Sequence, residues 1–118
     1  MSHGIRLVVI ESPFAALTVK DKRANIAYAQ DCMLDSLRRG EAPILSHLLY
    51  TQVLDDNKPD ERTIGMSAGF AWHCVVNAVI VYTDRGISNG MKAGISLASL
   101  LEKPIEYRSL HEKETDRG

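Results

Sequence analysis

Short runs of aliphatic and β-branched residues alternate along the chain with longer stretches in which apolar residues recur every three or four positions. The short runs predict strands at residues 5–10, 42–46, 77–82 and 105–108. The longer stretches predict helices at residues 20–39, 60–74 and 90–101. Regular alternation of strands and helices is typical of a parallel sheet with helices on both faces. The pattern therefore predicts an α/β domain.

The spacing within the helices also predicts which side chains face the core. In the helix at residues 20–39, the residues in register are Ile26, Ala29, Gln30, Met33 and Leu37. In the helix at residues 60–74, the inward-facing candidates are Ile64, Phe70 and His73. Gly65 and Gly69 are poor helix formers, and their spacing of four residues predicts a close approach by another backbone or by a ligand.

Length and composition indicate one ordinary globular domain. The chain has 118 residues, of which we expect residues 5–108 to form the core and residues 109–118 a charged tail. Hydrophobic residues make up 45% and charged residues 25%, which excludes intrinsic disorder. The 14 basic and 15 acidic residues give a net charge of −1. This balance leaves no basic surplus for binding polymeric nucleic acid.

The sequence gives no sign of a membrane span, a secretion signal or a metal site. No apolar run approaches the roughly 18 residues of a membrane helix, and the first residues lack the apolar core of a signal peptide. We therefore expect a cytoplasmic protein in which Cys32 and Cys74 are buried, reduced thiols. The acidic stretch around residues 55–61 lacks the calcium-loop pattern, so we interpret it as a solvated loop.

The candidate site residues follow the ends of the predicted strands, because open parallel sheets bind ligands beyond the carboxyl ends of their strands. After the first strand come Glu11, Ser12, Pro13 and Phe14. After the second come Ser46, His47 and Tyr50. After the third comes the polar turn at residues 83–90, which opens the last helix.

The turn at residues 83–90 is the most informative of these connections. Gly86 and Gly90 bracket it, and Ser88 or Asn89 can cap the helix that follows. Free N–H groups and the positive end of the helix favour an anion there, such as a phosphate or a carboxylate. A capped turn with glycines for backbone geometry alone is the other interpretation. Because Lys92 comes two residues after Gly90, the turn is not a Walker loop.

Ionisable side chains in the other connections also have two interpretations each. Glu11 and Asp84, expected at the ends of adjacent strands, can act as acid, base or acceptor for sugar hydroxyls, or can simply be solvated strand ends. His47 can be a base or a ligand contact, whereas His73 suits a satisfied interior histidine. Arg62 begins a helix, where a cation is unfavourable, so it either pairs with Asp84, a loop carboxylate or a ligand anion, or is exposed.

The pattern of these motifs over residues 5–108 resembles the nucleoside 2-deoxyribosyltransferase-like superfamily, especially its small uncharacterised bacterial and phage members. The matching residues are Glu11-Ser12-Pro13-Phe14, Asn25, Tyr28-Ala29, Gly40-Glu41-Ala42-Pro43, Ser46-His47, Leu54-Asp55-Asp56, Arg62, Gly65, Tyr82-Thr83-Asp84, Gly86-Ile87-Ser88 and Gly90-Met91. The resemblance implies a three-layer, flavodoxin-like (Rossmann-like) fold with a short parallel sheet of about four to five strands. It also implies a nucleoside or nucleotide pocket and a homo-oligomer.

The chain departs from the enzymes of that superfamily at their nucleophile. Their Gly-Met-Glu-x-Gly-x-Ala motif supplies a glutamate that attacks the anomeric carbon of deoxyribose. Here the matching segment is Gly90-Met91-Lys92-Ala93-Gly94-Ile95-Ser96, which places Lys92 at the nucleophile position. A protonated amine cannot replace the glutamate, but it can bind phosphate as a point charge.

Three functional hypotheses follow. The first is a binding protein, without a cofactor, for a nucleotide, a nucleoside phosphate or an ADP-ribose-like ligand. Its contact residues are Ser12, Pro13, Phe14, Tyr50, Arg62, Gly86, Ile87, Ser88, Asn89, Gly90, Met91 and Lys92. The second is an enzyme that hydrolyses or transfers at an N-glycosidic bond, with Asp84 or Glu11 as nucleophile or base and His47 assisting. The third is an interaction protein without a ligand, so whether the chain is an enzyme stays open.

Overall fold

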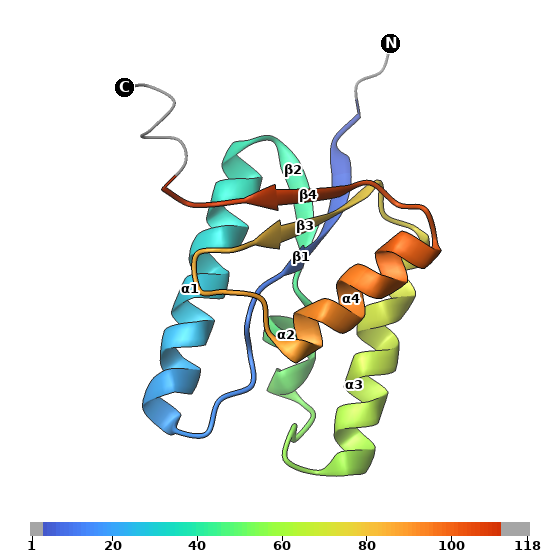
Figure 1. Cartoon of the computed structure of the whole chain (residues 1–118). Helices are drawn as coiled ribbons and strands as arrows, with labels where there is room; N and C mark the ends of the chain where they lie inside the picture. Colours follow the sequence, from blue (N-terminus) through green and yellow to red (C-terminus); the bar gives the residue numbers. More distant parts are fainter. Residues whose placement is uncertain (1–3, 112–118) are drawn as a thin grey trace.

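A four-stranded parallel sheet is the central layer of the protein, seen in a computed structural model that describes residues 4–111 (Figure 1). The strand order is β2-β1-β3-β4. The strands are β1 (Arg6–Glu11), β2 (Glu41–Ile44), β3 (Ala78–Tyr82) and β4 (Ile105–Arg108). The helices are α1 (Val19–Arg38), α2 (Ser46–Leu49), α3 (Pro59–Ala71) and α4 (Asn89–Leu100), with short 3₁₀ turns η1 (Tyr50–Gln52) and η2 (Trp72–Cys74). The predicted α/β, flavodoxin-like fold is confirmed.

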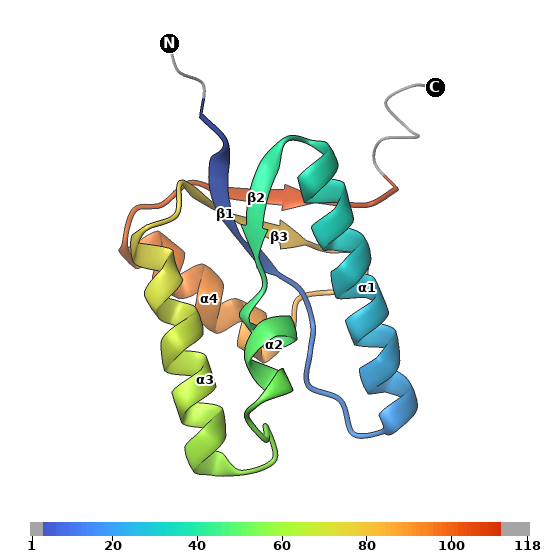
Figure 2. The ribbon, with the colours of Figure 1, turned by 180° about the vertical axis from the view of Figure 1, so that it is seen from behind.

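Helices cover both faces of the sheet (Figures 1 and 2). Ile10 and Ile80 face α1 and pack against its Ala29. On the opposite face, Val79 packs with Ala98 of α4. Because β1 and β3 are covered on both sides, their sequences are continuous apolar runs rather than alternating ones. Among the described helices, none has the length and apolar character that crossing a membrane requires.

The buried face of α1 differs from the predicted one. Gln30 and Leu37 are exposed, and the inward positions include Asp35 and Ser36 instead. The sheet explains this difference, because it presents polar groups to the end of α1. Ser36 donates a 2.8 Å hydrogen bond to Glu41 of β2, and the Tyr82 hydroxyl of β3 donates a 2.7 Å bond to Asp35. Polar side chains therefore occupy helix positions for which spacing alone favours aliphatic ones.

Two predictions around α3 are also corrected. Ile64 is 58% exposed, because α3 runs past the sheet and only Gly69 of this helix is fully buried (Figure 2). Cys74 in η2 is exposed, whereas Cys32 on the sheet side of α1 is buried as predicted. His73 is buried, as the spacing predicted.

A buried ion pair connects the two edge strands across the α1 face of the sheet. Arg108 of β4 donates to both carboxylate oxygens of Glu41 in β2, at 2.9 and 2.6 Å. Both side chains are 7% exposed. Burial opposes ionisation of Glu41, but hydrogen bonds from Arg108 and Ser36 outweigh it and lower the pKa of this carboxyl. The first and last strands of the sheet are thus joined by two charge-assisted hydrogen bonds.

We expect Arg108→Ala to destabilise the protein by about 3–5 kcal/mol, because it leaves the Glu41 carboxylate buried without its cation. Urea denaturation measures the loss. Lys58→Ala is the matched control, since Lys58 lies 3.8 Å from Glu61 in an exposed pair. It should cost less than about 1 kcal/mol. Similar losses in the two variants would contradict a special role for the buried pair.

Candidate functional site

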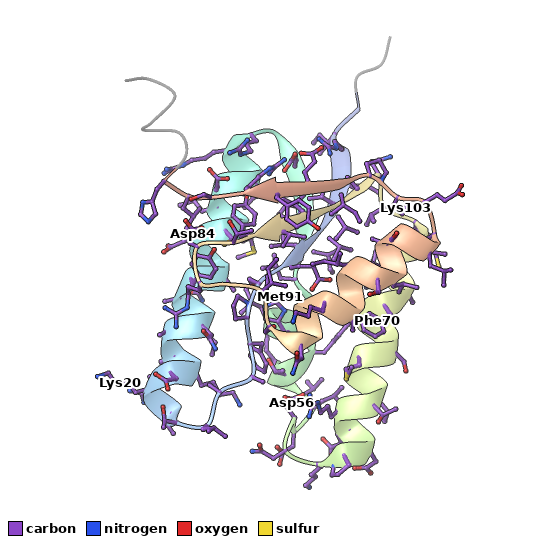
Figure 3. All side chains as sticks on the ribbon, in the orientation of Figure 1. Lys20, Asp56, Phe70, Asp84, Met91 and Lys103 are labelled. Atoms are coloured by element: carbon purple, nitrogen blue, oxygen red, sulfur yellow. The ribbon has the colours of Figure 1, made fainter. Side chains whose placement is uncertain are left out.

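A cavity of about 440 Å³ opens at the carboxyl ends of β1 and β2, between the loop after β1 and helices α3 and α4. Figure 3 labels three of its residues, namely Met91 on α4, Phe70 on α3 and Asp56 before α3. Beta1 lies where the connections diverge, because its neighbours β2 and β3 are reached over opposite faces. This is the switch point at which open α/β sheets bind ligands. The wall comprises Val9, Ile10, Glu11, Ser12, Phe14, Ala15, Ile44, Ser46, His47, Asp56, Arg62, Met66, Gly69, Phe70, His73, Ser88, Asn89, Gly90 and Met91.

Glu11, the last residue of β1, brings a carboxyl group to the cavity wall. Its side chain lies directly on α4 at Gly94, where a Cβ atom would be 2.0 Å from Glu11 Oε2. On another side, Oε2 lies 3.5 Å from Nε2 of His73. Burial raises the pKa of Glu11, while the contact with His73 acts in the opposite direction. The site therefore has a carboxyl group that holds its proton more strongly than an exposed glutamate does.

Ser12 and His47 form a second polar group on the wall. Ser12 Oγ and His47 Nε2 share a hydrogen bond at 3.2 Å. The ring of Phe14 lies 5.2 Å from the imidazole, centroid to centroid. Burial lowers the pKa of His47 to about 4, against an opposing effect of Asp56, so this imidazole is neutral at pH 7. It can exchange hydrogen bonds with a ligand without adding charge.

The N-terminus of α4 opens onto the same cavity. Ser88 is its N-cap, as one of the two predicted alternatives had it, and its hydroxyl accepts a 3.3 Å hydrogen bond from the N–H of Met91. Within residues 4–111, the N–H groups of Asn89 and Gly90 have no partner. These groups and the dipole of the 12-residue helix favour an anion. Arg62, on the α3 wall, forms no ion pair with any described residue.

The cavity brings together most of the predicted site residues. Those in its wall are Glu11, Ser12, Phe14, His47, Arg62, Ser88, Asn89, Gly90 and Met91. Tyr50 lines an adjoining space of about 80 Å³ instead, together with His47 and Asp56. Pro13, Gly86, Ile87 and Lys92 lie outside both described cavities. Met91 is buried while the next residue, Lys92, is exposed, because α4 turns successive side chains by about 100°.

Asp84 lies at the end of β3 but not in the cavity wall; Figure 3 shows it beside α1. Its carboxylate accepts hydrogen bonds from the hydroxyls of Tyr28 and Ser109, at 2.7 and 2.6 Å, and from the N–H of Leu110. Burial opposes ionisation, but these bonds outweigh it and lower the pKa of Asp84. Asp84 therefore anchors the segment after β4, including two residues that we expected in the tail. The rest of that tail, residues 112–118, lies outside the described residues.

Sequence reasoning missed several wall residues. Asp56, Met66 and Phe70 carry no recognisable motif, since the turn of the chain before α3 brings them to the cavity. The Gly65/Gly69 spacing did carry a signal, although side chains rather than another backbone make the close approach. A Cβ atom at Gly69 would lie 2.5 Å from Ser46 Oγ. Among the described residues, no group of three or more potential ligands could hold a metal ion.

Comparison with known proteins places the chain in a family. Residues 6–108 match the family model described as a domain of unknown function, DUF7768. The chain belongs to this family. A search of curated proteins finds no match to this DUF7768 chain.

A solved structure confirms the fold of the DUF7768 chain. It is a 2-deoxyribosyltransferase from the psychrotolerant bacterium Bacillus psychrosaccharolyticus, and it superposes with a TM-score of 0.63 at 13% sequence identity. The match covers 87% of this chain and 72% of the other. At this identity the likeness establishes a common fold and, with it, a structural relationship to the deoxyribosyltransferases.

We expect Gly94→Ala to destabilise the protein by about 1–3 kcal/mol, because the new methyl group would overlap the Glu11 carboxyl. Chemical denaturation measures the change. Gly90→Ala is the matched control on the same helix, since its nearest neighbour, Ser88 Oγ, is 4.0 Å away. Combining Gly94→Ala with Glu11→Ala should recover most of the loss. A cost that is the same with and without the Glu11 side chain would contradict this contact.

Proposed function

We propose that this DUF7768 protein binds a nucleotide, a nucleoside phosphate or an ADP-ribose-like ligand in the 440 Å³ cavity. The supporting observation is that one cavity combines a cationic, amide-lined end with aromatic walls and a carboxyl group. Its volume is within the roughly 300–1,000 Å³ of small-molecule sites. A phosphate, a flat base and a sugar are the three parts that such a wall suits.

The phosphate part of the ligand would lie at the N-terminus of α4. The N–H groups of Asn89 and Gly90 are available to it, and Ser88 and Arg62 line the same cavity. Backbone N–H groups at a helix end donate directly to phosphate oxygens, and an arginine can add two parallel hydrogen bonds. Lys92, which the sequence suggested for this role, is directed elsewhere and is not part of the proposal.

The rest of the ligand would occupy the part of the cavity between Phe14 and Phe70. Their rings supply apolar surface for a base, and Glu11 and Ser12 supply hydrogen-bonding groups for sugar hydroxyls. The fold shared with a 2-deoxyribosyltransferase adds to this proposal, because that enzyme is described as a catalyst for nucleoside synthesis. The homo-oligomer and the cytoplasmic location stay predictions.

Calorimetry with a nucleotide panel tests the proposal. We expect AMP or a related monophosphate to bind more tightly than the matching nucleoside, and Arg62→Ala to weaken binding about tenfold through the lost phosphate contact. Arg38→Ala is the control, since Arg38 is an exposed arginine at the far end of α1. Absence of binding at millimolar ligand across the panel would overturn the proposal.

Cleavage of an N-glycosidic bond is the second candidate function, and the position of Glu11 favours it. With lysine at the usual nucleophile position, Glu11 is the glutamate that the cavity wall contains. A Glu11 oxygen would attack the anomeric carbon as the carbon–nitrogen bond breaks, and the base would leave with the bonding electrons and take up a proton. Water or a second base would then release the sugar from the ester. The third hypothesis lacks support, since the cavity is open rather than filled by Phe14 and Met91.

Chromatography for released free base tests this second function. If the protein cleaves nucleosides or nucleotides, Glu11→Gln should lower the rate by about a hundredfold or more, as loss of a reacting group does. Asp84→Asn is the matched control, because its carboxylate ends the neighbouring strand outside the cavity wall. A rate that falls in Asp84→Asn and not in Glu11→Gln would assign the reaction to Asp84 instead.

A further inference from the structure

His73 is a buried histidine whose hydrogen-bonding groups the fold leaves unused. It is 1% exposed, and within the described part of the chain neither ring nitrogen has a hydrogen-bond partner. Leaving a buried polar group unsatisfied costs about 1–3 kcal/mol, so such a group calls for an explanation. Its surroundings do not require a histidine for packing, since the ring meets the edge of Phe70 at 5.8 Å as an aromatic core residue would.

The one charged neighbour that the structure gives His73 is Glu11. Nε2 lies 3.5 Å from Oε2, which is about 0.6 Å longer than a charge-assisted hydrogen bond. Gly94 lies on the other side of the Glu11 carboxyl and has no side chain to fill the space. The Glu11 side chain is 14% exposed and that of His73 2%, so Glu11 lies between the cavity and the imidazole. A small movement of Glu11 closes the hydrogen bond.

We infer that His73 is a positioning residue for Glu11, and that the two form a buried proton-sharing pair which keeps this wall of the cavity free of net negative charge while a phosphate-bearing ligand is bound. A pair with one proton is neutral overall, whether the proton is on the carboxyl or on the imidazole. A pair without that proton has one uncompensated negative charge. The ligand half of this inference rests on the proposed function, whereas the pair itself does not.

The other ionisable groups on the wall set the local charge balance. They are His47 of α2, Asp56 before α3 and Arg62 of α3, while α4 contributes Ser88, Asn89, Gly90 and Met91. His47 is neutral, because burial lowers its pKa to about 4. Asp56 and Arg62 have opposite charges. The proton on the Glu11–His73 pair therefore decides whether this wall attracts or repels an anion.

The geometry places that charge close to the proposed phosphate position. Gly94, on which Glu11 lies, is one helical turn beyond Gly90, or roughly 6 Å along the helix axis. A negative charge at such a distance weakens anion binding about tenfold or more at the effective dielectric constant of a protein site. Ligand affinity should therefore fall as the pH rises through the range in which the pair loses its last proton.

The pair is tested first without a ligand, by following the carboxyl carbon of ¹³C-labelled Glu11 by NMR as a function of pH. His73 stabilises the charged form of Glu11, so His73→Phe should move the titration midpoint of Glu11 upwards. His73→Gln, whose amide can donate to the carboxylate, should restore part of the difference. His111→Phe is the control, because His111 is an exposed histidine. A midpoint that stays the same in folded His73→Phe and His73→Gln would overturn the pair.

The second experiment measures AMP binding by calorimetry from pH 5 to pH 9 in the wild type and in Glu11→Gln. Titration of the AMP phosphate affects both proteins alike, so the ratio of their affinities isolates the pair. We expect similar affinities at low pH and about tenfold tighter binding by Glu11→Gln at high pH. A constant ratio would overturn the charge role of the pair. If AMP and its analogues do not bind at all while the NMR shift is present, the proposed function fails and the pair stands.

Discussion

Alpha4 can lie against the end of β1 only because position 94 has no side chain. The Glu11 carboxyl occupies the volume that a Cβ atom would need, so the helix and the strand approach each other through a polar group rather than an aliphatic contact. That approach places the start of α4 beside the loop after β1, and it closes one wall of the cavity. The helix amides, the aromatic rings and the Glu11–His73 pair all depend on this docking for their common location.

The sequence was sufficient for the elements and for the position of the site. Apolar runs located the strands, and the Ser88 cap marked the start of α4. It was not sufficient to separate Glu11 from Asp84, because the face to which a strand-end residue points depends on the pairing between strands. Glu11 shares the α4 face with Val9, whereas Asp84 follows the α1 face with Tyr82. Both carboxylates end adjacent strands, yet they lie on opposite sides of the sheet.

His73 and Ser36 show a related limit of reading a sequence by periodicity. Helical spacing placed His73 inside, but whether an interior histidine is satisfied depends on groups from distant parts of the chain. Similarly, Ser36 is buried because Glu41 and its partner Arg108 make that corner of the sheet polar. Hydrophobic pattern records the average environment of a helix face, whereas a buried ionic network changes individual positions within it.

The anchoring of Ser109 and Leu110 by Asp84 has a consequence for the extent of the folding unit. The last strand ends at Arg108, but the two residues after it satisfy a carboxylate that is also bound to α1 through Tyr28. A fragment cut at the strand boundary would leave that acid short of donors and would loosen the attachment of the first helix. The smallest autonomous form of this domain therefore includes a few residues beyond its regular secondary structure.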